Sequence, residues 1–164
     1  MLIKKPQQGF FLLEALIAIL IFSLGVLGMV AMGGAAIAAQ SDAQYRTDAA
    51  NLANDIIGAI SLNVDRTSAA TLAATLDPYQ HQPGGANCVF SGAASANNAV
   101  LNWVDKVRTV GAGLPGLPGA TATSQQIAIQ STAGGGFNRV SVTICWQAPS
   151  DKAVRQFTLV NYVN

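Results

Sequence analysis

A long apolar segment near the N-terminus constrains this chain more than any other feature of its sequence. Between Phe10 and Ala39 the only charged side chain is that of Glu14, which is also the only glutamate in the protein. The segment is longer than the roughly 20 residues that a helix needs to cross a bilayer. A carboxylate at the start of such a segment is costly in lipid, so Glu14 is a candidate functional residue.

The balance of apolar and charged side chains favours membrane insertion of this segment. Each large apolar side chain between Phe10 and Val30 contributes about 0.3–0.6 kcal/mol, whereas an acidic residue at the centre of a helix costs about 2.5–3.5 kcal/mol. We therefore expect the segment to insert despite its carboxylate. Lys4 and Lys5 precede it, and the positive-inside bias then places the N-terminus in the cytoplasm and the rest of the chain across the membrane.

Two simpler interpretations of the segment remain open. A secretory signal peptide would use Ala36-Ile37-Ala38 as its small-residue cleavage site, but the apolar core of a signal peptide normally has about 7–15 residues. A plain membrane anchor would leave Glu14 without a role, its carboxylate reaching toward the interface.

The N-terminal residues resemble those of the type IV prepilin family. Its members carry a basic leader that ends in Gly, followed by Phe and then by Glu five residues past the cut; here the leader is 1–9, and Phe10 and Glu14 follow. The resemblance implies that prepilin peptidase cuts after Gly9 and methylates the new amine of Phe10. Glu14 lies one helical turn away, and the resemblance implies that it pairs with the amine of an adjacent subunit; a pair within one chain stays open.

PilV-type minor pilins are the most similar group within this family. In the N-terminal helix the resemblance rests on Leu12-Leu13-Glu14-Ala15-Leu16 and Leu24-Gly25-Val26-Leu27-Gly28. In the head it rests on a Trp followed by the connector Leu114-Pro115-Gly116 and on a late strand ending in Cys145-Trp146. Two features depart from the family pattern. Phe11 stands where Thr or Ser is usual, and glycines occur where many major pilins carry a proline.

The chain is expected to have an α+β, pilin-like fold in three parts. These are a cytoplasmic leader (1–9), a transmembrane or filament-core helix (10–39) and a periplasmic head (40–164). Apolar residues at helical spacing predict that the first helix continues into the head as far as Asn63: Ala43, Ala50, Ala53, Ile57 and Ile60. The head is expected to pack this helix against a small antiparallel sheet of about three to four strands.

Further segments of the head have their own patterns. Helices are predicted over 69–76 and 98–110, and strands over 126–130, 138–147 and 154–163, in an antiparallel meander. In the second strand Val140, Val142 and Ile144 alternate with polar residues, which predicts a half-buried strand. The Gly-, Asn- and Pro-containing stretch 79–98 is predicted to be a long loop with His81 exposed to solvent.

The two cysteines, Cys88 and Cys145, both follow the apolar segment and so fall on the oxidising side of the membrane. A disulfide between them would stabilise the head by about 4 kcal/mol on the chain-entropy model. Two buried free thiols are the alternative. Together with the single histidine they show no metal-ligand spacing, so no metal site is expected.

Composition argues against several classes of function. The formal charge is +1, which gives no electrostatic footprint for nucleic acid. The head contains no glutamate, one histidine and no recognisable catalytic motif, so the convergent groups that acid–base or nucleophilic catalysis needs are lacking. We expect no enzyme activity, no catalytic residues and no cofactor.

The resemblance therefore implies a minor pilin of a type IV pilus, placed in the bacterial inner membrane with a periplasmic head, or in the pilus fibre at the cell surface. Its expected partners are prepilin peptidase, other minor and major pilins through the N-terminal helix, the inner-membrane assembly platform and membrane lipid. A minor pseudopilin of a type II secretion system is one alternative. An adhesive, ligand-binding head is another, with four candidate aromatic residues: Tyr79, Trp103, Trp146 and Tyr162.

Overall fold

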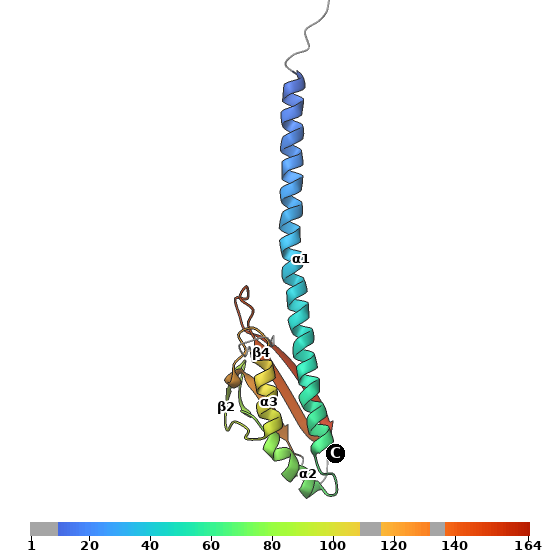
Figure 1. The fold of residues 1–164 in the computed structure, drawn as a ribbon, viewed down its shortest axis with the longest axis vertical. Coiled ribbons are helices and arrows are strands. Elements are labelled where there is room, and N and C mark those ends of the chain that lie inside the picture. The colour runs from blue at the N-terminus through green and yellow to red at the C-terminus, as the bar shows by residue number, and fades with distance from the viewer. Residues whose placement is uncertain (1–9, 109–115, 132–136) are drawn as a thin grey trace, which may run out of the picture. The chain divides into compact units, whose positions relative to one another are not determined.

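The computed structural model describes residues 10–108, 116–131 and 137–164. The chain forms two compact units, Met1–Ala43 and Gln44–Asn164, and we call the second unit the head. Helix α1 (Phe10–Asn63) contributes its first part to one unit and its second part to the other. The fold is α+β as predicted: one long apolar N-terminal helix, whose second part packs in the head with a three-stranded and a two-stranded antiparallel sheet (Figure 1).

Helix α1 has 54 residues, and no proline interrupts it. Its packing face in the head is formed by residues three or four positions apart, which lie on one side of a helix: Ala49, Ala53, Ile56, Ile57 and Ile60. Ala53, Ile57 and Ile60 were predicted for this face. Ala43 and Ala50 were predicted wrongly, since Ala43 is exposed and Ala50 is half-buried. An alanine-rich stretch offers little contrast in size, so only the isoleucines mark the face clearly.

The end of α1 is held by a side chain that follows it. The guanidinium of Arg66 donates to the carbonyl oxygens of Ser61 (2.7 Å) and Asn164 (3.0 Å). The last carbonyls of a helix have no partner within the helix, and Arg66 satisfies one of them while contacting the residue that follows the last strand. Helix α2 (Ala69–Leu76) comes next, as predicted, and starts at a capping box formed by Ser68 and Thr71.

The main sheet is an antiparallel meander in the order β3-β4-β5. Its strands are β3 (Gln125–Gln130), β4 (Asn138–Trp146) and β5 (Arg155–Val163). Each begins and ends within one residue of the predicted segment. The register places Val142 of β4 between Ile127 of β3 and Leu159 of β5, so one face of the sheet presents a row of apolar side chains toward α1.

A short hairpin occupies part of the stretch that was predicted to be a loop. Its strands are β1 (Gly84–Ala86) and β2 (Val89–Ser91), joined by a two-residue turn at Asn87 and Cys88. Both turn residues have positive φ, 53° and 65°, as a type I′ turn requires. Strands of three residues are too short to show an alternating pattern, which is why the sequence did not reveal them.

The predicted disulfide is present and joins this hairpin to the main sheet. Cys88 in the hairpin turn is bonded to Cys145 of β4, with a Cα–Cα distance of 5.8 Å. The prediction that β4 is buried on one face only was wrong for its C-terminal part. Thr143 and Cys145 point away from α1 and are nevertheless buried. The hairpin that is bonded to Cys145 closes off this end of the outer face.

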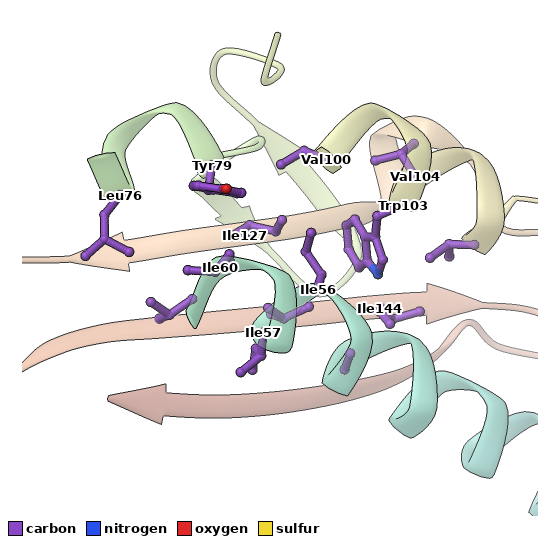
Figure 2. Packing of buried hydrophobic residues seen from close by; sticks show 14 of the residues in the cluster. Ile56, Ile57, Ile60, Leu76, Tyr79, Val100, Trp103, Val104, Ile127 and Ile144 are labelled. Atoms are coloured by element: carbon purple, nitrogen blue, oxygen red, sulfur yellow. The ribbon is translucent and has the colours of Figure 1, made fainter. Parts of the chain in front are cut away.

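Helix α3 (Asn98–Val107) completes the core of the head. It ends three residues earlier than predicted, with Arg108 as its C-cap. Trp103 lies between α3 and α1 (Figure 2), and its indole Nε1–H donates to the carbonyl oxygen of Leu52 on α1 at 2.8 Å. The large buried side chains around it come from α1, α2, α3 and the sheet, so the core forms one continuous cluster.

Candidate functional site

The first turn of α1 holds the residues to which the sequence assigned a role. Phe10 is the first residue of the helix and Glu14 follows one turn later, so their side chains project from the same side of the helix. Both side chains are exposed. Among the residues that the structure describes, Glu14 has no hydrogen-bond or ion-pair partner. Gly9 and the rest of the leader lie outside the described residues.

The apolar part of α1 is long and apolar enough to cross a membrane. Its most apolar window has a mean hydropathy of 2.7, and no residue of that window is buried within the chain. Large side chains on every side of the helix are exposed, from Phe10 and Phe11 to Val30 and Ile37. A helix that is apolar all round requires apolar surroundings, either lipid or other helices.

The hydroxyl groups of Ser23 and Ser41 on α1 are satisfied within the helix. The hydroxyl of Ser23 donates to the carbonyl oxygen of Ile19 at 2.7 Å, and that of Ser41 donates to Ile37 at 3.1 Å. Such internal bonds remove the cost of placing a hydroxyl in lipid. Glu14 is therefore the one side chain of the segment 10–39 whose charge still requires a partner.

The glycines of the segment have no close neighbour among the residues that the structure describes, apart from those of their own helix. A Cβ atom added at Gly25, Gly28, Gly33 or Gly34 would meet nothing within 4 Å. None of them has an internal packing reason, and none has an unusual backbone conformation in the described helix. No described residue of the chain therefore packs against these positions, which leaves them open to other helices or lipid.

The aromatic residues proposed as a ligand surface do not come together on the surface. Tyr79, Trp103 and Trp146 are buried in the core, and only Tyr162 is exposed. Tyr162 instead contacts Phe137 edge to face, with ring centroids 6.5 Å apart. The sequence did not single out Phe137, which is a lone aromatic after a glycine run and carries no pattern that could have marked it.

His81 was predicted to be exposed, and this was wrong: its relative exposure is 3%. Its ring Nδ1 accepts from the backbone N–H of Ser95 at 3.2 Å, and its Nε2 lies 3.1 Å from the carbonyl oxygen of Ala122. Its backbone also forms a bridge with Ile127 of β3. His81 thus fastens the segment before the hairpin to the sheet, a role that its polar, Gly-rich surroundings in the sequence did not indicate.

Two depressions on the described surface of the head are lined by polar and apolar side chains. One depression of about 220 Å³ lies between α1 and α3 and is lined in part by Asp55, Trp103 and Lys106. The other, of about 310 Å³, is lined in part by Asp77 and Ser95. Within the described ranges, no three of His, Cys, Asp and Glu come together in a way that could hold a metal ion.

Two carboxylates of the head are tuned by local hydrogen bonds. The pKa of Asp151 is lowered mainly because Arg155 donates to both of its oxygens, each at 2.9 Å. The pKa of Asp65 is lowered mainly because the backbone N–H of Thr67 donates to it. Both groups stabilise turns, Asp151 between β4 and β5 and Asp65 after α1, and neither lines the two depressions described above.

No similar protein indicates the class to which this chain belongs. No protein-family model, curated protein or solved structure matches the chain. The class of protein is therefore defined by the fold: an apolar N-terminal helix long enough to span a membrane, which continues into a head, packs there against a small antiparallel sheet and is accompanied by a disulfide. This architecture is pilin-like.

Proposed function

We propose that this chain is a minor pilin of a type IV pilus. Prepilin peptidase would cut it between Gly9 and Phe10 and methylate the new amine. The product would wait in the inner membrane and then take part in the initiation of pilus assembly, priming the filament at its tip. One observation carries the proposal: the apolar part of α1 has no covering partner within the described chain, whereas the second part of the same helix is the packed spine of the head.

The physical basis is a change of surroundings for one helix. In the membrane, lipid covers the apolar side chains of segment 10–39. In a filament, the corresponding helices of other pilins would replace the lipid, with the open glycine positions allowing close approach. The assembly platform of the inner membrane would bring the subunits together.

Glu14 supplies the specificity that apolar packing lacks. Its carboxylate has no partner among the described residues, and an unpaired charge in an apolar environment is costly. The amine of a mature Phe10 on a neighbouring subunit would provide the missing positive charge. A subunit displaced along the helix axis would lose this pair, so Glu14 would fix the register of assembly.

Mass spectrometry of the N-terminus tests the proposal directly. The protein is purified from cells with and without prepilin peptidase. We expect a mature chain that starts with N-methylated Phe10 in the first case and an intact leader in the second. A mature chain that starts at any other residue, or one that is unchanged by loss of the peptidase, would contradict the proposal.

Substitution of the carboxylate tests its role in assembly. Glu14→Ala should leave membrane insertion and processing intact and should strongly reduce the amount of protein that co-purifies with other pilin subunits. Ser23→Ala is the matched control, because the Ser23 hydroxyl is satisfied within its own helix and its loss should change nothing. Equal co-purification of wild type and Glu14→Ala would remove the proposed role.

A further inference from the structure

The two edges of the main sheet differ in whether their backbone groups have partners. At the β3 edge, the N–H of His81 donates to the carbonyl oxygen of Ile127 at 3.0 Å, and the N–H of Ile127 donates back to His81 at 2.9 Å. A non-sheet segment thus closes this edge at its middle. The other edge is β5, and within the described ranges it pairs with β4 alone.

Side-chain hydrogen bonds show which β5 residues face outward. The side-chain amide of Gln125, on β3, bonds to both the N–H (3.2 Å) and the carbonyl oxygen (3.0 Å) of Cys145, so the backbone groups of Cys145 point toward β3. Backbone direction alternates along a strand, and Ile144 therefore points toward its β5 partner Phe157. The β5 residues that point away from the sheet are consequently the alternate ones: Gln156, Thr158, Val160 and Tyr162.

An independent contact supports this assignment. The N–H of Tyr162 donates to the side-chain oxygen of Asn161 at 2.9 Å, which it could do only if it is not engaged with β4. Asn161 thus caps one outward donor. No hydrogen bond to the outward backbone groups of Gln156, Thr158 or Val160 is present in the described part of the chain.

The β5 edge also lacks the usual protection against strand pairing. Proteins commonly guard an exposed edge with proline, lysine, an inward-facing charge or a very short strand. β5 has nine residues, and from Gln156 to Val163 it contains no proline and no charged residue. Phe157 and Leu159 are only partly buried where they pack against the core. At this edge, backbone N–H and C=O groups are available to hydrogen-bond a further strand, and the partly buried side chains are available to pack against it.

These features define the chemistry that a partner of the β5 edge must have. A row of alternating N–H and C=O groups at strand spacing is matched by one kind of ligand, a polypeptide in extended conformation. Side chains on one side of the incoming strand would lie beside Phe157 and Leu159. Those on the other side would lie beside Thr158 and Tyr162, the latter 59% exposed. The fitting segment is therefore uncharged and alternates apolar with small polar or β-branched residues.

We propose that the β5 edge is a binding site for an extended segment of a different polypeptide, which adds a fourth strand to the sheet. A second copy of this chain fits less well. Head-to-tail pairing would need the β3 edge, which His81 closes. Two-fold pairing of β5 with β5 would turn the second head end for end along its strands, and because β5 runs alongside the second part of α1 within the head (Figure 1), α1 would then leave the two heads at opposite ends. Chains anchored in one membrane share a direction; this last step rests on the proposed function, whereas the site itself does not.

The test uses the full-length chain in detergent micelles and a defined probe. The probe is a blocked peptide of alternating threonine and valine with a lysine at each end for solubility, and the same peptide N-methylated at each valine is its control. Amide hydrogen exchange is followed by NMR. We expect the unmodified peptide to slow exchange at Gln156, Thr158 and Val160, and the methylated peptide to have no effect.

A proline substitution distinguishes the binding role of the β5 edge from its role in the fold. Val160→Pro removes an outward N–H while keeping every bond to β4, so the head should stay folded and its peptide affinity should fall about tenfold or more. Val160→Thr keeps the N–H and should bind like wild type. Asn161→Ala frees the donor of Tyr162 and should extend the protected region to that amide.

Several outcomes would overturn the proposal. It fails if the peptide protects amides elsewhere or none at all, or if Val160→Pro folds and binds as tightly as wild type. It also fails if light scattering shows a dimer that Val160→Pro dissociates, because the occupant would then be a second copy. If Val160→Pro does not fold, Thr158→Pro and the methylated peptide decide the same question. The N-terminal mass spectrum is unaffected by all these results, so the proposed function stands or falls separately.

Discussion

The two parts of helix α1 use similar residues in opposite ways. Ile21 in the apolar part is 63% exposed, whereas Ile60 in the head is fully buried. Both are isoleucines in the same unbroken helix. The difference lies in what the described chain supplies as a partner: core side chains from α2, α3 and the sheet for Ile60, and nothing for Ile21. An isoleucine is therefore stabilised by burial at either position, but only in the head do other described residues of the chain bury it.

The surfaces of the two parts differ accordingly. In the head, α1 has a narrow packing face that includes Ala49 and Ala53, and its other sides carry polar residues such as Asn54 and Asp55. In the segment 10–39 the apolar side chains surround the helix. A one-sided face fits a sheet, whereas an all-round apolar surface fits a membrane or a bundle of like helices.

Removing the disulfide should destabilise the head more than any single substitution in its core. The double variant Cys88→Ala/Cys145→Ala should lower the free energy of unfolding of the head by about 4 kcal/mol, because the loop between the two residues is no longer closed. Denaturant titration monitored by tryptophan fluorescence would measure it. Membrane association, which depends on segment 10–39, should not change; a parallel loss of both would mean that the two parts are not independent.

Two identical substitutions test the comparison within α1. Ile60→Ala leaves a cavity in the core and should lower the stability of the head by about 3 kcal/mol. Ile21→Ala, in the same helix, should change it by less than about 0.5 kcal/mol. Thermal unfolding in the same micelles would compare the two. Equal effects would show that the apolar part also has an internal partner.

A smaller effect is expected from the hydrogen bond that joins α3 to α1. Trp103→Phe keeps an aromatic ring in the core but removes the Nε1–H donor to the carbonyl of Leu52. The loss should be about 1 kcal/mol for the hydrogen bond, plus a contribution from the smaller ring. Urea denaturation would measure it, with Trp146 as the remaining fluorophore. A loss as large as that of Ile60→Ala would show that ring volume, rather than the hydrogen bond, dominates.

The smallest effect concerns pH. Because the pKa of Asp151 is lowered in the folded head by Arg155, its contribution to stability is fully present above the ordinary aspartate pKa of about 3.9. That contribution is lost as the pH falls through the lowered value. Asp151→Asn should therefore be slightly less stable than wild type near neutral pH, and the gap should close in acid. Denaturant titrations of both proteins at a series of pH values would measure the gap, and one that widens on acidification would contradict the assignment.

The sequence predicted the regular elements of this fold well. A continuous apolar and then amphipathic pattern without proline predicted α1 as far as Asn63, where it ends. Alternation of Val140, Val142 and Ile144 predicted β4, and the two isolated cysteines predicted the disulfide. These features are local, or they follow from the compartment in which the head is expected to lie, so a single sequence contains the necessary information.

What the sequence could not predict depends on contacts between distant segments. The exposure of His81 was predicted wrongly because its partners, Ser95, Ala122 and Ile127, lie far from it along the chain. The hairpin escaped notice because its turn relies on positive φ in two residues other than glycine. The difference between the two sheet edges is likewise a property of strand order. For the N-terminal site, the pairing of Glu14 with the amine of another subunit stays a prediction.

The link between Cys88 and Cys145 also changes how the chain responds to pulling. The two residues are 57 positions apart, and a stretch of that length would extend by about 190–200 Å if it were fully unravelled. Because the disulfide bypasses this stretch, a force applied between the two ends of the chain cannot extend it. Helix α3 and strand β3 lie inside the protected loop, so tension could straighten the head only outside it.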